Sequence, residues 1–194
     1  MSILYTGTMK LIVGLGNAES KYDGTRHNVG FWCVEQFAAS RGLSFAPKDK
    51  LRARIAEFGA GDDKVIVAQP TTYYNMSGEA VRAIAGFYHI TPHDILLIYD
   101  EMSLPFGTIR TRRGGSDAGN NGVKSITQHI GPETARLRIG TATELRERMD
   151  DADFVLSRFT ASELSALADR LPKLYSLIDS FIDNTFDITT HVSI

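Results

Sequence analysis

Short apolar runs alternate with helical patterns of hydrophobic residues along the first half of the chain. Residues 9–16 form an apolar run that ends in glycine, which is typical of a buried strand. The next hydrophobic positions recur at helical spacing and predict a helix over residues 27–41, ended by a glycine. Residues 51–58 alternate in polarity and residues 64–69 return as a second strand. The turn-forming residues between these two segments therefore predict a hairpin.

The second half of the chain repeats this alternation of strands and helices. After a polar loop, the pattern predicts a helix ending near residue 88, a buried strand over residues 94–101 and an edge strand over 108–113. A flexible Gly-rich loop over 114–122 then leads into a helix over 123–130 and a strand over 135–140. The last predicted element is a helical region from Ser162, which Pro172 divides in two. Helices interleaved with strands, together with one hairpin, predict an α/β fold: a single three-layer domain with a mixed, mostly parallel sheet flanked by helices.

Length and composition are those of one soluble globular domain. The chain has 194 residues, of which 43% are hydrophobic and 23% charged. We expect residues 1–8 to be an N-terminal extension and residues 9–194 to form a single catalytic domain. The sequence has no apolar run long enough for a membrane span and no signal peptide. The single cysteine, Cys33, lies in an apolar helical pattern and fits a reducing compartment, so we expect a cytoplasmic protein.

The net charge of −2 conceals an uneven distribution of charge. Residues 105–148 contain eight Lys and Arg but four Asp and Glu, whereas the rest of the chain is acidic. One interpretation of this basic section is an ordinary solvated strand face. The other is a surface that binds nucleic-acid phosphates, formed by Arg110, Arg112, Lys124 and Arg138.

Polar side chains capable of chemistry follow several predicted strands. His27 and Asn17 come after the first strand, Asp100 ends a later one, and Asn75 and Asn121 lie in loops that lead into helices. In open α/β sheets, ligands bind at the carboxyl ends of the strands. Histidine exchanges protons near neutral pH, and a carboxylate beside it can orient it. The set predicts a histidine base with an acidic partner, although a lone histidine near a helix start is often only structural.

No second chemistry has comparable support in the sequence. Ser77 lies near these residues, but its position is that of a helix start rather than of a nucleophile. Pro92 separates the single pair of histidines at helical spacing, His89 and His93, so we expect no zinc and no cofactor. The Gly-rich loop lacks the Gly-Lys-Ser/Thr ending of a P-loop. A base that acts directly on water, on an already activated bond, is the remaining interpretation.

Five ordered motifs resemble those of the bacterial-type peptidyl-tRNA hydrolases. They are Gly-Leu-Gly-Asn at residues 14–17, Thr-Arg-His-Asn-Val-Gly at 25–30, Pro-Thr-Thr-Tyr-Tyr-Asn-Met-Ser-Gly at 70–78, Asp-Glu at 100–101, and the Gly-rich loop at 114–122. The resemblance extends over about residues 9–185. It implies hydrolysis of the ester that joins a peptide to the terminal ribose of tRNA, which recycles tRNA after aborted translation.

The resemblance also implies roles for individual residues. His27 would deprotonate water, Asp100 would orient His27, and Asn17 would complete the catalytic set. Substrate contacts would come from Tyr22, Tyr74, Asn75 and Asn121, and tRNA phosphate contacts from Arg110, Arg112, Lys124 and Arg138. The implied partner is peptidyl-tRNA, bound by a monomer without a membrane.

Several positions depart from the family pattern, among them Ala18, Tyr74, Ser103 and Asn120. Tyr74 stands where a methionine is usual, and Asn120 replaces the histidine of a common Gly-His-Asn-Gly sequence. The alternative function is that of a non-catalytic, splicing-type RNA-binding relative with the same fold. The intact His27, Asp100 and Asn17 count against that alternative.

Overall fold

The computed structural model describes residues 8–189 and residues 191–192. The expected N-terminal extension, residues 1–8, lies outside the described residues except for Thr8. The side chain of Thr8 donates a hydrogen bond to Asp94, at 3.3 Å. The division of the chain into an extension and a domain thus stays a prediction.

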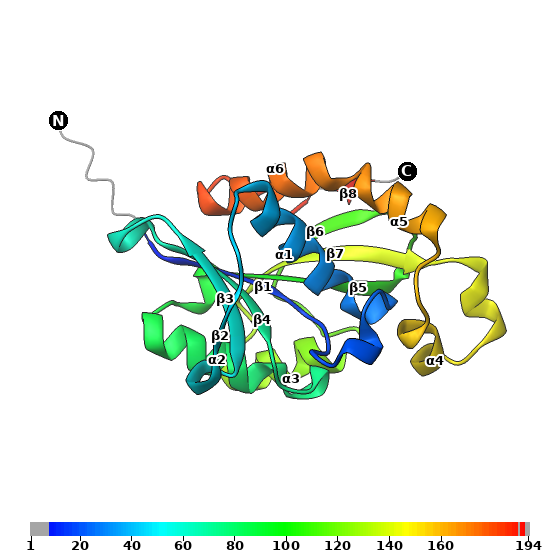
Figure 1. Cartoon of the computed structure of the whole chain (residues 1–194), viewed down its shortest axis with the longest axis horizontal. Coiled ribbons are helices and arrows are strands. Elements are labelled where there is room, and N and C mark those ends of the chain that lie inside the picture. The colour runs from blue at the N-terminus through cyan, green and yellow to red at the C-terminus, as the bar shows by residue number, and fades with distance from the viewer. Residues whose placement is uncertain (1–7, 190, 193–194) are drawn as a thin grey trace.

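An eight-stranded mixed sheet forms the centre of the molecule, with strand order β2-β3-β4-β1-β5-β7-β6-β8 (Figure 1). The strands are β1 (Lys10–Gly14), β2 (Ala46–Lys48), β3 (Ala53–Phe58), β4 (Val65–Pro70), β5 (Ile95–Pro105), β6 (Ile109–Arg113), β7 (Ala135–Ala142) and β8 (His191–Val192). The four central strands, β4, β1, β5 and β7, are parallel to one another. The predicted α/β fold with its mixed sheet is confirmed, as is the antiparallel β3–β4 hairpin.

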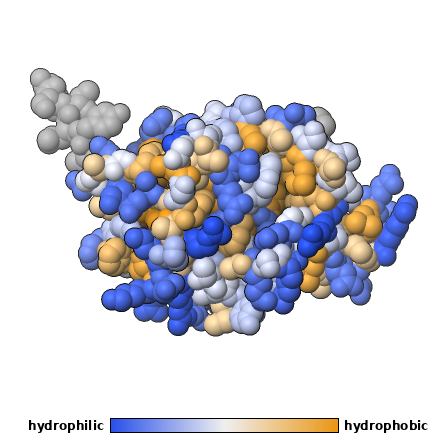
Figure 2. All heavy atoms as spheres, in the orientation of Figure 1, coloured by the Kyte–Doolittle hydropathy of each residue, from blue (hydrophilic) through white to orange (hydrophobic). Residues whose placement is uncertain are grey.

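Helices cover both faces of the sheet and give three layers. The helices are α1 (Val29–Ser40), α2 (Ser77–Tyr88), α3 (Asn121–Ile130), α4 (Asp151–Leu156), α5 (Ala161–Ala168) and α6 (Leu171–Ile182). Figure 1 shows α2 and α3 on one side of the sheet and α5 and α6 on the other. Each face buries its own cluster of aliphatic and aromatic side chains. On the face of the molecule seen in Figure 2, apolar patches are separated by polar residues.

Two glycines let α1 cross β1 in direct backbone contact. A Cβ atom on Gly30 would lie 2.2 Å from the carbonyl oxygen of Ile98, and one on Gly14 would lie 2.3 Å from the carbonyl oxygen of Gly30. No side chain fits at either position, because the clashing atoms belong to the backbone. This close approach brings the first turn of α1 to the carboxyl end of β1 and to the middle of β5.

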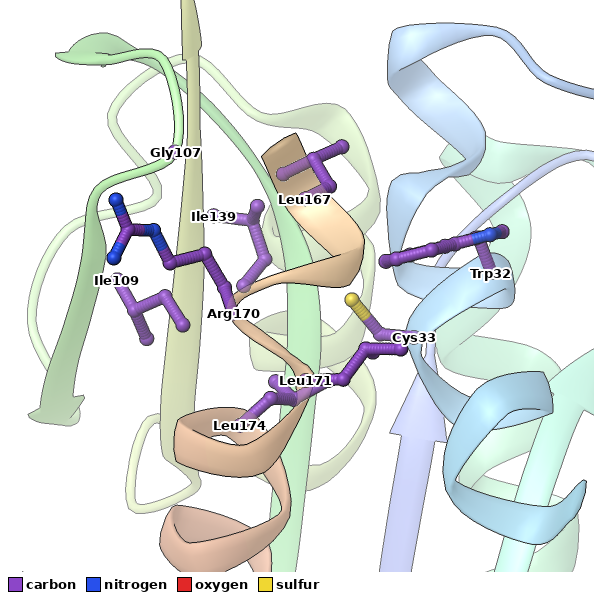
Figure 3. A pocket seen from close by; sticks show the side chains of 9 residues that line it. All are labelled: Trp32, Cys33, Gly107, Ile109, Ile139, Leu167, Arg170, Leu171 and Leu174. Atoms are coloured by element: carbon purple, nitrogen blue, oxygen red, sulfur yellow. The ribbon is translucent and has the colours of Figure 1, made fainter. Parts of the chain in front are cut away.

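Cys33 lies in the apolar layer between α1 and the C-terminal helices (Figure 3). Its side chain faces a gap of about 10 Å³, which is room for one water molecule at most. Burial raises the pKa of the thiol, which keeps it protonated. Cys33 is a core residue, as the sequence predicted.

Some predicted elements differ from those observed. The segment 108–113 is not an edge strand, because the two-residue strand β8 pairs with β6 on its outer side. The helix expected from residue 27 begins at Val29, after a separate 3-10 turn, η2 (Arg26–Asn28). Strand β5 runs beyond Glu101 to Pro105, with a shift in register against β7. Pro172 lies in the first turn of α6, where its missing N–H costs no helical hydrogen bond.

Candidate active site

His27 lies in the turn η2, directly before α1. The Thr25 hydroxyl donates to the carbonyl of Tyr22 at 2.8 Å, and the Asn28 N–H donates to the carbonyl of Thr25 at 3.0 Å, which fixes this turn. The His27 side chain is 18% exposed, so one edge of the imidazole faces solvent. The other edge faces the sheet.

Asp100 contacts that inner edge of His27. Asp100 lies in the middle of β5 and is 4% exposed, and its carboxylate oxygens are 2.9 and 3.0 Å from His27 Nδ1. A carboxylate only accepts hydrogen bonds, so we assign the imidazole proton to Nδ1. His27 Nε2 is then the basic atom available to solvent. The predicted pairing of histidine and carboxylate is present in the geometry.

Asn17 is held in place by two neighbouring loops. Its backbone N–H and carbonyl form reciprocal hydrogen bonds with the Asn28 side chain, at 2.8 and 2.9 Å. Its side-chain oxygen accepts from the backbone N–H of Tyr74 at 3.0 Å. These contacts assign the orientation of the Asn17 amide, which leaves its nitrogen as a donor for a bound molecule.

An open pocket joins His27 to three of the predicted amides. It is lined by Asn17, His27, Tyr73, Tyr74, Asn75, Met76 and Asn121. A second hollow adjoins it and shares Asn17, Tyr73 and Met76. Tyr22, which was expected to contact the substrate, is absent from the lining of both hollows. The structure therefore brings most of the predicted site together but not Tyr22.

The sequence interpretation missed the role of Arg26, which anchors the η2 turn. Its guanidinium is 1% exposed and donates to Glu163 at 2.8 Å. It also lies 4.9 Å from the ring centroids of both Phe154 and Phe159. No periodic pattern marks this residue, because all of its partners come from the C-terminal segment.

The predicted phosphate-binding residues lie on β6, β7 and α3. Arg110 pairs in register with Arg138, and Arg112 with Arg136, so these four side chains share one face of the sheet. Lys124 is exposed on α3. We call Arg110, Arg112, Lys124 and Arg138 the basic patch.

Arg138 and Arg136 on this face contact other parts of the protein. Arg138 is 12% exposed, and its guanidinium lies 3.5 Å from the Glu101 carboxylate. Arg136, which the sequence interpretation did not select, is 1% exposed and donates to the carbonyls of Ser116 and Gly115 at 2.7 and 3.0 Å. Arg136 thus holds the Gly-rich loop.

Neither a metal-binding cluster nor a membrane-spanning helix occurs in the described part of the chain. Groups of three or more His, Cys, Asp or Glu side chains close enough to hold a metal ion are absent there. Of the helices at residues 8–189, none has the length and hydrophobicity needed to cross a membrane.

Comparisons with known proteins agree with the geometry. The family model described as peptidyl-tRNA hydrolase matches residues 11–192. The peptidyl-tRNA hydrolase of Ligilactobacillus salivarius is 44% identical over 177 residues, which cover 91% of this chain and 94% of that protein. The same enzyme of Pelodictyon phaeoclathratiforme is 47% identical, covering 84% and 86%. The crystal structure of peptidyl-tRNA hydrolase from Acinetobacter baumannii is similar, with a TM-score of 0.82 and 36% identity, covering 91% of this chain and 89% of that one.

Proposed function

The chain belongs to the peptidyl-tRNA hydrolase family, and we propose that it cleaves the ester of peptidyl-tRNA with His27 as the base that activates water. The observation that carries the proposal is the contact between His27 Nδ1 and the buried Asp100 carboxylate. Non-catalytic RNA binding is not favoured, because the relatives are named as hydrolases.

In the proposed reaction, His27 Nε2 takes a proton from water as the water oxygen attacks the ester carbonyl carbon. Asp100 keeps the other imidazole nitrogen protonated and stabilises the positive charge that forms on the ring. The Asn17 side-chain nitrogen donates to the oxyanion of the tetrahedral intermediate. When the carbon–oxygen bond to the ribose breaks, the imidazolium returns its proton to the leaving hydroxyl. Asn75 and Asn121 line the same pocket and contact the substrate.

A histidine variant with a matched control tests this function. Release of peptide from an N-acylated aminoacyl-tRNA should fall about 100-fold or more in His27→Ala, with little change in melting temperature. His89→Asn is the control, because it removes an imidazole that is exposed to solvent. The backbone φ of 55° at residue 89 is an angle that asparagine readily adopts. Undiminished turnover in His27→Ala would remove this residue from the mechanism.

The basic patch is the proposed contact for the tRNA backbone. It begins beside the catalytic strand, because Arg138 pairs in register with Tyr99, the residue before Asp100. Arg138 would then share its guanidinium between Glu101 and a phosphate. The proposed partner is thus the whole peptidyl-tRNA, bound by a monomer in the cytoplasm, where translation supplies the substrate.

Salt dependence tests this contact. Replacing Lys124 or Arg112 by alanine should reduce the slope of log affinity against log salt by about one. Cleavage of a short aminoacyl ester without the tRNA body should not change. Lys173→Ala on α6 is the control, because this exposed lysine lies on the opposite face of the sheet. Equal losses on both substrates would assign Lys124 and Arg112 to the fold instead.

A further inference from the structure

Tyr74 and Asn120, two of the departures from the family pattern, are linked to each other and to the proposed catalytic pair. Its hydroxyl donates to the Asp100 carboxylate at 2.9 Å, and the Asn120 side-chain nitrogen donates to the same hydroxyl at 2.9 Å. The ring of Tyr74 also stacks on the His27 imidazole, with centroids 3.5 Å apart and planes 19° from parallel. One side chain therefore contacts both His27 and Asp100.

The start of α3 fixes the direction of both hydrogen bonds made by the Tyr74 hydroxyl. The Asn120 side-chain oxygen accepts from the Val123 N–H at 3.0 Å and caps the helix, so its nitrogen must face Tyr74. The Tyr74 oxygen accepts from that nitrogen, which leaves its single proton for Asp100. Burial and then the charge of Asp100 raise the pKa of Tyr74, which keeps this proton in place at neutral pH.

The ring is held as firmly as the hydroxyl. Tyr74 is 5% exposed, and a Cβ atom on Gly122 would lie 2.6 Å from its ring. The first turn of α3 thus packs directly against the Cδ1 and Cε1 atoms of the Tyr74 ring. Because His27, the first turn of α3 and the two hydrogen-bond partners of the hydroxyl all contact this side chain, the ring is held in one orientation.

We propose that Tyr74 and Asn120 act together as positioning residues that hold Asp100 and thereby orient His27. These two departures from the family pattern are then one coupled feature, since each side chain needs the other to aim its hydrogen bond. The inference rests on the proposed role of His27 as the base. It gives the Tyr74 hydroxyl a role in positioning Asp100 and His27, beyond lining the pocket as a substrate contact.

The hydroxyl should affect the pH profile in a definite direction. Its hydrogen bond draws negative charge on Asp100 away from His27, so it weakens the stabilisation of the imidazolium. Without the hydroxyl, the imidazolium becomes more favoured and a higher pH is needed to form the active base. Other titratable groups near the pair include Tyr73, which lines the same pocket, Tyr99, and the Glu101–Arg138 ion pair on β5 and β7. Asn120 and Asn121, which the start of α3 places here, are neutral.

Three variants of this pair test the inference. In Tyr74→Phe, the acid limb of the kcat/KM profile should move to higher pH by about half a unit, with kcat about 3–10-fold lower and KM little changed. Asn120→Ser keeps a helix cap, but its shorter side chain lacks the amide N–H group that reaches Tyr74, so it should shift the profile the same way by less. The double variant should resemble Tyr74→Phe alone. Tyr175→Phe on α6, which removes a hydroxyl far from the site, should keep the parent profile.

The outcomes separate this inference from the proposed function. Activity in His27→Ala equal to that of the parent protein would overturn the proposed function. An inactive His27→Ala together with an unmoved acid limb in Tyr74→Phe would overturn the positioning role alone. Additive losses in the double variant would show that Tyr74 and Asn120 act independently, which contradicts the coupling.

Discussion

Adding one methyl group at Gly30 should separate α1 from the sheet. In Gly30→Ala the new carbon would lie 2.2 Å from the carbonyl oxygen of Ile98 and 2.6 Å from the backbone nitrogen and oxygen of Leu15. These atoms belong to β5 and to the end of β1, so no side-chain rotation can relieve the contact. The helix itself has to move.

The distances set the size of the effect. Ordinary contacts of a Cβ atom are 3.4–4 Å, so α1 must shift by about 1 Å against the core that it covers. Overpacking of a core usually costs about 1–3 kcal/mol, and a clash with backbone belongs at the upper end of that range or above it. For a protein of this size, a loss of about 3 kcal/mol lowers Tm by roughly 6–12 °C.

A second glycine provides the control. Gly86 is exposed in α2, and a Cβ atom added there would meet no atom within 4 Å, so Gly86→Ala should stabilise the protein by about 0.5–1 kcal/mol. Thermal and urea unfolding followed by circular dichroism would compare the two variants. If Gly30→Ala unfolded like the parent protein, the inferred backbone contact between α1 and the sheet would be wrong.

Two further predictions concern charged groups at the site. Asp100→Asn should move the acid limb of the pH–rate profile to lower pH, because the charge that stabilises the imidazolium is gone. It should also lower the plateau rate about 100-fold or more. The Tyr74 hydroxyl would donate to the new amide oxygen and so turn the amide nitrogen toward His27, which would place the imidazole proton on Nε2. An unchanged pH–rate profile would contradict the contact between Asp100 and His27. Burial alone would raise the pKa of Glu163, but hydrogen bonds from the Thr160 backbone and from Arg26 outweigh burial and lower that pKa. The ionised carboxylate therefore stabilises the fold at pH values above the usual titration range of glutamate. Glu163→Gln should therefore cost about 1–3 kcal/mol in urea unfolding at pH 7, with the difference shrinking toward pH 4; a constant difference would refute the assignment.

The sequence predicts the convergence of His27 and Asp100 because strand geometry is local. Apolar runs mark β1 and β5, and the carboxyl ends of parallel neighbours meet at one edge of the sheet. The observed contact of 2.9 Å requires only these two strands and the turn after the first. Periodicity and turn chemistry were sufficient for this part of the site.

Contacts that depend on tertiary packing could not be predicted in the same way. Arg26 follows a turn and carries a charge, which favours exposure, yet Glu163 and two phenylalanines more than 120 positions away bury it. The hydrogen bond from Tyr74 to Asp100 depends on two rotamers and on the start of α3, none of which has a periodic signal. The short strand β8 was missed since two residues carry no alternation.

The anchoring of Arg26 makes the C-terminal segment part of one cooperative unit with the catalytic turn. Two backbone hydrogen bonds join them as well: the Arg26 N–H donates to Ser157 and the Phe159 N–H donates to Gly24, at 3.0 and 2.9 Å. Any local opening that detaches α5 from the sheet also frees the turn that carries His27. We therefore expect amide hydrogen exchange at Arg26 and Phe159 to proceed through one shared opening, which releases the turn that carries His27 before the central sheet unfolds.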